Sequence, residues 1–202
     1  MIHGYKIVNL QVLINEMGEE FAKSYLSDFS CPLNHDVENF LKYKAIDFSK
    51  QSLSQTHLVM ASHKKRPVLV GYFTLANKNI SVSAKGLSNS NKRRISKFSI
   101  YYPQIRKYVL TAPLIAQLGK NYTNGYNKLI TGDELLAIAC EKVKSIQLDL
   151  GGRYVYLECE ENPRLIDFYK ENGFCEFDKR ELDKEETDIQ GKYLIQMLKY
   201  LK

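Results

Sequence analysis

A short stretch that begins at Pro113 restricts the fold of this chain more than any other segment. Leu114 to Leu118 has the apolar composition of a strand, and it leads into a loop rich in Asn and Gly that opens a helix. The first turn of a helix has unpaired N–H groups and partial positive charge, so such a loop is suited to binding phosphate. Gly132 allows the backbone to approach a ligand closely, and Lys128 adds a full charge. A plain structural turn is the alternative interpretation.

The remaining composition indicates one cytosolic domain. With 202 residues, the chain is long enough to bury a hydrophobic core and suits a single domain over 1–202. We find no apolar run long enough to span a membrane, and the first residues lack the basic region and apolar core of a signal peptide. The four Cys have no CxxC spacing, so we expect neither a metal site nor a disulfide framework. Buried free thiols are expected at Cys140 and Cys159.

Charge is distributed unevenly along the chain. The formal net charge is +6, but basic residues gather between His63 and Lys107, whereas the C-terminal part is acidic and includes the run 183–186. A solvated surface is one interpretation of the basic region. The other is a groove for a polyanion such as the phosphates of CoA or RNA. In that case the nucleic-acid-binding residues would be Lys92, Arg93, Arg94, Lys97, Arg106 and Lys107.

Hydrophobic periodicity predicts a mixture of helices and strands. A strand at 5–8 precedes a helix at about 10–27, whose apolar stripe is expected in the core. A second helix, near 37–45, would be capped by Asn34 or Asp36.

The middle of the chain predicts a hairpin and then a long helix. Strands at 56–61 and 67–76 flank a polar turn, and the strand pattern reappears at 80–82. A long apolar stripe over 135–150 suits a helix that packs on a sheet and ends at Gly151 and Gly152. The chain is therefore expected to form an α/β domain.

A second motif follows the long helix. A strand at 154–159 precedes Asn162, then a short helix that carries Phe168 and Tyr169, then a turn at Gly173 and Phe174 into another strand. In these positions the chain resembles the GNAT superfamily of acetyl-CoA-dependent N-acetyltransferases, and the resemblance extends over roughly residues 25–200. It implies a GNAT-like α+β fold, with a mixed, mainly antiparallel twisted sheet flanked by helices on both faces. The basic segment at about 77–112 would be an insertion.

The resemblance assigns the first motif to acetyl-CoA. The strand would pair with the pantetheine arm, and the loop would bind the pyrophosphate through backbone N–H groups. The chain departs from the family pattern, because Asn127 replaces an Arg or Gln and Ile130 replaces the first Gly. A bulky Ile at this position is expected to hinder close approach of a phosphate. The implied cofactor-binding residues are Ala116, Gln117, Leu118, Asn127, Lys128, Leu129, Thr131, Gly132, Asp133, Asn162 and Phe168.

The same resemblance implies direct attack of an amine on the thioester. Tyr169 occupies the position of the general acid, which gives a proton to the leaving thiolate. Core packing of Phe168 and Tyr169 is the alternative. Glu158 and Glu160 share one face of their strand, where they would act as the base through water or serve only as charged side chains. A backbone N–H of the 114–118 strand would hold the oxyanion.

The resemblance defines the acetyl-transfer reaction better than it defines the amine that accepts the acetyl group. The segment that begins F-S-C-P-L-N, together with P-L-I-A-Q-L-G, is similar to the GNAT branch that contains toxins of toxin–antitoxin modules. That branch implies the amine of aminoacyl-tRNA as the acceptor, an antitoxin protein as a partner and a homodimer. Acetylation of a small amine remains open. A non-catalytic module that binds nucleic acid or protein is the alternative function, for which Ile130 is the reason.

Overall fold

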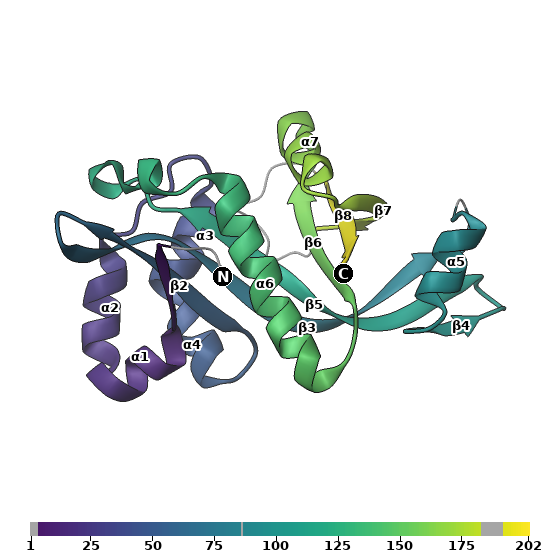
Figure 1. Ribbon diagram of the computed structural model, residues 1–202, viewed down its shortest axis with the longest axis horizontal. Helices are drawn as coiled ribbons and strands as arrows, with labels where there is room; N and C mark the ends of the chain where they lie inside the picture. Colours follow the sequence, from purple (N-terminus) through teal and green to yellow (C-terminus); the bar gives the residue numbers. More distant parts are fainter. Residues whose placement is uncertain (1–3, 86, 183–191) are drawn as a thin grey trace. The chain divides into compact units, whose positions relative to one another are not determined.

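The computed structural model describes residues 4–85, 87–182 and 192–202, and it divides into two compact units (Figure 1). The first unit contains Met1–Ala76 and Ile115–Glu141, and the second contains Asn77–Leu114 and Lys142–Lys202. Three elements contribute to both units: β3 (Arg66–Ser83), β5 (Lys107–Lys120) and α6 (Gly132–Leu150). The acidic run 183–186 lies outside the described residues.

The first unit has the strand order β1-β2-β3-β5, with β1 (Tyr5–Asn9) and β2 (Gln55–His63) antiparallel to their neighbours. The single helix expected at 10–27 is wrong. Gly18 adopts a φ of 88° and separates α1 (Leu10–Met17) from α2 (Glu19–Ser27). Gly18 donates its N–H to the Ile14 carbonyl, so the glycine terminates the first helix.

The second predicted helix forms in three consecutive parts, α3 (His35–Asn39), η1 (Phe40–Lys44) and α4 (Ala45–Lys50). Asn34 provides the N-cap, because its Oδ1 accepts the Val37 N–H at 3.1 Å. These helices pack on the first unit's core, which includes Leu10, Leu26, Phe29, Val37, Phe40, Leu41, Leu58, Leu69 and Tyr72.

The predicted hairpin is also confirmed. β2 and β3 pair antiparallel from Gln55–Leu75 to His63–Arg66, and Lys64 and Lys65 form the turn with positive φ. Inside the hairpin, the hydroxyls of Thr56 and Thr74 lie 2.8 Å apart and satisfy each other in a buried position.

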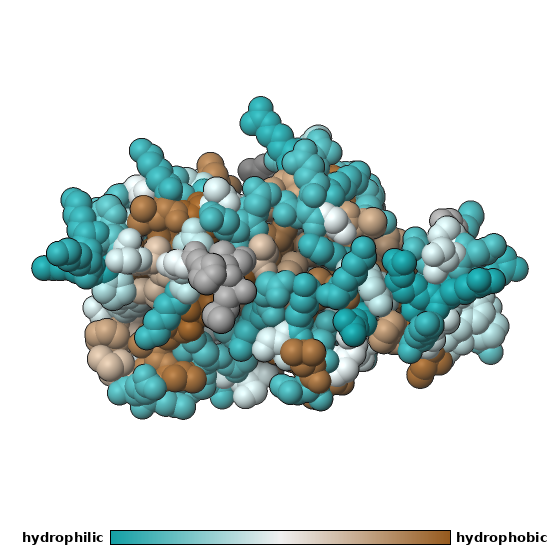
Figure 2. All heavy atoms as spheres, viewed as in Figure 1, coloured by the Kyte–Doolittle hydropathy of each residue, from teal (hydrophilic) through white to brown (hydrophobic). Residues whose placement is uncertain are grey.

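The second unit has the strand order β3-β5-β6-β8-β7, and β4 (Ile100–Tyr102) pairs with β5. The expected insertion is an ordered extension. β3 continues to Ser83, and α5 (Asn89–Ile95) packs beside the outer parts of β3 and β5, under the hydrophilic surface at the right of Figure 2. A hydrophobic core secures this extension and includes Ile80, Val82, Ile95, Leu110, Ala112, Tyr154 and Tyr156.

The C-terminal elements agree with the sequence pattern. They are β6 (Tyr154–Glu160), α7 (Pro163–Glu171), β7 (Cys175–Glu181) and β8 (Tyr193–Tyr200). β8 lies between β6 and β7 and is antiparallel to both. Gly151 and Gly152 end α6 with positive φ, as predicted. In the described part of the chain, no helix is both long and apolar enough to cross a membrane.

Candidate active site

The loop before α6 is held in place by two side chains that the sequence analysis did not select. The Tyr5 hydroxyl donates to the Leu129 carbonyl at 3.0 Å, and Lys120 Nζ donates to the Ile130 carbonyl at 3.0 Å. The N–H and C=O of a trans peptide point in opposite directions, so the Ile130 N–H points away from the Tyr5 hydroxyl. The loop is therefore preformed, with carbonyls fixed by β1 and β5.

The side chain of Ile130, which was expected to obstruct a phosphate, is directed into the protein. The Ile130 backbone is extended, with φ −147° and ψ 139°, and the whole residue is only 2% exposed. The side chain is therefore part of the first unit's interior. The bulk of Ile130 is turned into the protein, and its effect on a phosphate stays a prediction.

A capping box at the start of α6 reduces the number of N–H groups that are free to bind a phosphate. Glu134 accepts the Thr131 N–H at 2.8 Å and the Thr131 hydroxyl at 3.0 Å, and Thr131 Oγ1 accepts the Glu134 N–H at 3.1 Å. These bonds from Thr131 lower the pKa of Glu134, which is thus a carboxylate at the positive end of the helix. A phosphate that used the Thr131 N–H would have to displace Glu134.

The strand before the loop is tightly packed on its neighbours. A Cβ at Gly119 would lie 2.3 Å from Val37 Cγ1, so only glycine fits there without movement. Gln117, a predicted cofactor residue, donates to Asp36 Oδ2 at 2.8 Å. Ala116 is exposed, and Leu118 is partly buried.

Asn121 joins this strand to its surroundings and was also missed. Its Nδ2 donates to the Leu69 carbonyl at 2.9 Å, and its Oδ1 accepts the N–H groups of Ser30 and Thr123, each at 3.1 Å. The position of Asn121 directly after the strand is a weak signal, because two of these three partners, Ser30 and Leu69, are distant in sequence. With both polar atoms of its amide bonded, Asn121 fixes the point where the loop leaves β5.

The second motif folds as α7 and its flanking turns. Asn162 is the N-cap, since its Oδ1 accepts the Arg164 N–H at 3.0 Å, and Pro163 occupies the first helical turn. The side chain of Asn162 thus orients this turn, and its predicted contact with the cofactor stays a prediction. Phe168 is partly buried beside Tyr169, with ring centroids 5.1 Å apart.

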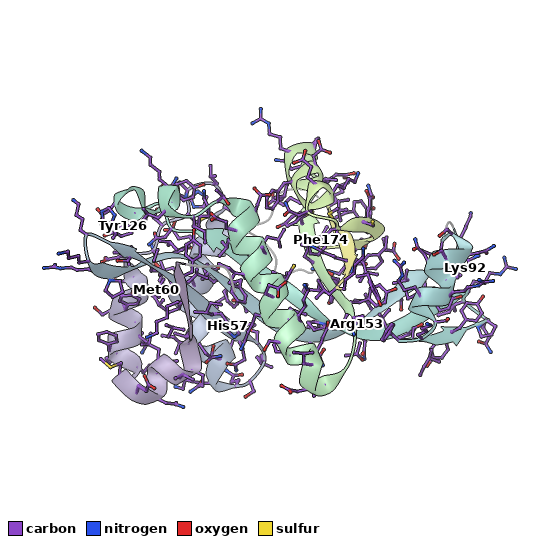
Figure 3. The ribbon with its side chains drawn as sticks, in the orientation of Figure 1. His57, Met60, Lys92, Tyr126, Arg153 and Phe174 are labelled. Atoms are coloured by element: carbon purple, nitrogen blue, oxygen red, sulfur yellow. The ribbon has the colours of Figure 1, made fainter. Side chains whose placement is uncertain are left out.

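Tyr169 is buried at the centre of this motif. The residue is 8% exposed, its ring makes an edge contact with the ring of Phe174 at 6.0 Å between centroids, and its carbonyl accepts the Phe174 N–H at 3.0 Å. Phe174 is labelled in Figure 3. Burial raises the pKa of Tyr169 well above the usual range, so the hydroxyl holds its proton at neutral pH. The structure shows no hydrogen bond between this hydroxyl and another described residue.

The thiol of Cys159 lies in the same buried surroundings. Burial, reinforced by Glu176 and Glu160, raises its pKa to about 11, and its Sγ lies 4.0 Å from Met197 Sδ. Cys159 is therefore a protonated thiol and not a nucleophile. The expected burial of Cys140 and Cys159 is confirmed.

Glu158 is engaged in a way that limits its use as a base. Arg180 donates to Glu158 Oε2 from Nε at 2.9 Å and Nη2 at 2.8 Å, and Gln196 donates to Oε1 at 2.7 Å. Proton uptake by Glu158 would break a charge-assisted pair. Glu160 lies on the same face of β6, opposite Leu194 of β8, and is partly buried. A catalytic role for either carboxylate stays a prediction.

The predicted nucleic-acid-binding residues separate into two groups. The Arg94 guanidinium lies 4.9 Å from the centre of the Tyr200 ring, and Lys107 Nζ is 3.7 Å from Asp178 Oδ2, so both have intramolecular partners. The others show no ion-pair partner in the described ranges, and they are Lys92, Arg93, Lys97 and Arg106.

The first unit also contains an open cavity of about 380 Å³, lined in part by Tyr25, Asp28, Asn121 and Tyr126. None of the predicted cofactor-binding residues lines this cavity. It is therefore separate from the loop at 127–132.

Comparison with known proteins identifies the fold. No protein-family model matches the chain, and no curated protein matches it. Solved structures do match. AtaT complexed with acetyl-methionyl-tRNAfMet is 18% identical, with a TM-score of 0.61 over 95% of this chain and 93% of that one. A point mutant of KacT, in which a phenylalanine replaces a tyrosine, is 15% identical, with a TM-score of 0.61 over 96% and 94%. AtaTR bound with AcCoA is 16% identical, with a TM-score of 0.54 over 96% and 93%. By these likenesses the chain has the GNAT-like fold of AtaT and KacT, which confirms the fold that the motif around Tyr169 predicted.

Proposed function

We propose that this protein is an N-acetyltransferase that transfers the acetyl group of acetyl-CoA to a primary amine by direct attack. The observation that carries the proposal is Tyr169, a buried residue whose hydroxyl keeps its proton and has no partner among the described residues. Support comes from the fold and from the matched structure of AtaTR, which is bound with AcCoA.

Tyr169 is proposed to supply the proton that the reaction requires. Bound acetyl-CoA would provide an activated thioester, so that a C–N bond forms as the C–S bond breaks. The Tyr169 hydroxyl would donate its proton to the departing sulfur, and the proton that the amine nitrogen loses as the amide forms would restore the hydroxyl, directly or through water. A Tyr with a raised pKa is a weak acid, but desolvation strengthens a thiolate as a base in the same way. The pKa of about 11 at the buried Cys159 thiol illustrates this effect.

The loop and the strand in the first unit are proposed to hold the cofactor. Ala116, Gln117 and Leu118 would pair with its pantetheine arm. Backbone N–H groups between Lys128 and Gly132 would bind the pyrophosphate, with added charge from the exposed Lys128 side chain. The fixed carbonyls of Leu129 and Ile130 fit this use, because they orient the loop before a ligand arrives.

The proposed acceptor is the α-amine of an aminoacyl-tRNA. The matched AtaT structure is complexed with acetyl-methionyl-tRNAfMet, and four basic residues of the second unit are unpaired in the described structure. The amine of an aminoacyl ester has a low pKa, so no strong base is needed. This agrees with a Glu158 carboxylate that is already bonded to Arg180 and Gln196. A protein partner comparable to AtaR, whose C-terminus is bound in a matched AtaT structure, and a cytoplasmic location are part of the proposal.

A non-catalytic binding module is the second candidate. Burial of Ile130 weakens the original reason for it, but the capping box provides another. Glu134 occupies two donors of Thr131 and places negative charge where a phosphate would bind. If Glu134 outcompetes a phosphate, the fold would have no cofactor and could bind only a macromolecule.

Thermal shift with acetyl-CoA and with CoA tests the proposal. A ligand at 100 times its dissociation constant stabilises a protein by about 2.7 kcal/mol, which is a shift of several degrees. Tyr169→Phe is the matched control, because it retains the ring and removes only the hydroxyl. We expect both proteins to shift alike, while only the wild type acetylates an amine at full rate. The absence of any shift at millimolar acetyl-CoA would contradict the acetyltransferase and favour the binding module.

A further inference from the structure

The extension of the second unit, residues 77–114, is a folded arm and will be called the basic arm. It consists of the outer parts of β3 and β5 together with α5 and β4. The Ala84 N–H donates to the Arg106 carbonyl at 2.9 Å, and Ser88 Oγ caps α5 by accepting the Asn91 N–H at 3.2 Å. Because its apolar side chains share a hydrophobic core with Tyr154 and Tyr156 of β6, the arm can present side chains on a fixed scaffold.

The basic arm carries positive charge without compensation from its own residues. No Asp or Glu occurs between Asp47 and Asp133, and the arm contains eight Lys or Arg. Arg94 and Lys107 have partners from other elements, whereas Arg93, Lys97 and Arg106 are exposed and show no ion pair within the described part of the chain. Such a surface creates a local positive potential and attracts a polyanion.

The arm also exposes flat aromatic rings beside these charges. Tyr101 and Tyr102 of β4 are each 43% exposed, and Ile100 next to them is 65% exposed. The Tyr101 ring rests 4.8 Å from the ring of its cross-strand partner Tyr108, which limits its motion. Large apolar side chains gathered on an edge strand are unusual unless a partner covers them.

Cations alone would suit any polyanion, including duplex RNA. Rings beside cations favour unpaired nucleotides, whose bases stack on aromatic side chains while their phosphates bind Lys and Arg. Arg106 lies in the turn between Tyr102 and Lys107, which are cross-strand partners, so a cation adjoins the exposed rings. A protein partner would need a strongly acidic surface to match an arm with no carboxylate.

We propose that the basic arm binds unpaired nucleotides of an RNA, with Tyr101 and Tyr102 stacking on bases and Arg93, Lys97 and Arg106 neutralising phosphates. The inference rests on the proposed function insofar as the RNA is the one that carries the acceptor amine. The inference assigns the rings of β4 to substrate recognition. Arg94 and Lys107 are assigned to the stability of the arm, through their contacts with Tyr200 and Asp178.

Fluorescence anisotropy with a labelled single-stranded RNA of about 12 nucleotides, and with the matching duplex, tests the arm. The charge variant is Arg93→Gln with Lys97→Gln and Arg106→Gln. It should weaken single-strand binding at least tenfold and make the slope of log K against log salt shallower by about 2, measured from about 50 to 200 mM salt. The matched control removes equal charge from the β2–β3 turn, with Lys64→Gln, Lys65→Gln and Arg66→Gln, and should change binding less than twofold.

Tyr102→Ala separates stacking from charge. It should weaken single-strand binding about 5- to 100-fold with an unchanged salt slope, because only base stacking is lost, and it should affect the duplex little. Equal losses from the arm and the control turn, or unchanged single-strand binding by Tyr102→Ala, would overturn the proposal. So would retention of RNA binding by the charge variant, which would make the arm a protein docking surface. Circular dichroism melting of each variant confirms that it is folded.

The same variants distinguish this inference from the proposed function. Thermal shift with acetyl-CoA and acetylation of a small amine should be unaffected by changes in the arm. If acetyl-CoA produces no thermal shift but the arm variants lose RNA binding, the proposed acetyltransferase function is refuted and the RNA-binding role of the arm is supported. If acetyl-CoA binds and the arm variants bind RNA as the wild type does, the RNA-binding role of the arm is refuted and the proposed acetyltransferase function is supported.

Discussion

Replacement of Ile130 gives the most direct test of how the loop before α6 is built. The residue is 2% exposed, and the extended backbone suits Ala as well as Ile, so Ile130→Ala removes three buried carbons without backbone strain. Three lost carbons at about 0.8 kcal/mol each, together with the cavity left behind, predict a loss of about 2–5 kcal/mol. The melting temperature should fall by about 4–20 °C. Ile130→Val is the matched control, with a loss of about 0.5–1.5 kcal/mol.

Urea denaturation followed by circular dichroism measures the stability, since the chain has no Trp to report by fluorescence. Calorimetric titration with acetyl-CoA measures the second consequence. If Ile130 obstructed the phosphate, Ile130→Ala would bind acetyl-CoA more tightly than the wild type. Because the side chain is buried, we expect equal or weaker binding. Tighter binding, or a stability change below about 0.5 kcal/mol, would refute the reasoning.

Three further changes test the site. Tyr169→Phe should lower kcat by about 10²–10⁴ with unchanged acetyl-CoA affinity. Because burial raises the pKa of Tyr169, ionisation of this group should cause no decline in the wild-type kcat over roughly pH 6 to 9. Such a decline would contradict the assignment. Glu134→Gln should reduce stability by about 1 kcal/mol at neutral pH. Since the pKa of Glu134 is lowered from 4.5 in the folded state, this contribution is present above that value and disappears as acid protonates the carboxylate, so both proteins should unfold alike at low pH. The same change should tighten acetyl-CoA binding in titration calorimetry, and weaker binding would show that Glu134 does not compete with phosphate. Gly119→Ala places a Cβ 2.3 Å from Val37 Cγ1 and should reduce stability by about 1–3 kcal/mol in urea denaturation, with partial rescue by Val37→Ala; additive losses would contradict the contact.

Much of the fold could be predicted because its signals are local. The N-caps at Asn34 and Asn162, the glycines after α6 and the hairpin turn at Lys64 and Lys65 depend on residues only a few positions apart. The break at Gly18 was missed for the opposite reason. Apolar periodicity continues across it, and a single Gly inside a helical pattern is often tolerated.

The site residues that could not be predicted depend on long-range contacts. Tyr5 reaches Leu129 across 124 positions, and Glu158 binds residues 22 and 38 positions away. The capping box, by contrast, was readable from Thr131 and Glu134, whose spacing is a known signal. It was missed because Thr131 was assigned to phosphate binding and Glu134 was given no role.

The sequence by itself determined the β2–β3 hairpin, the long helix α6, the motif that carries Tyr169 and the charge of the basic arm. These follow from periodicity, capping and composition, which act over a few neighbouring residues. Only the tertiary structure decided that Ile130 is turned inward, that Arg94 and Lys107 have partners, and that Tyr101 and Tyr102 stay exposed. Burial and pairing depend on which distant segments meet, and that is a property of the folded chain.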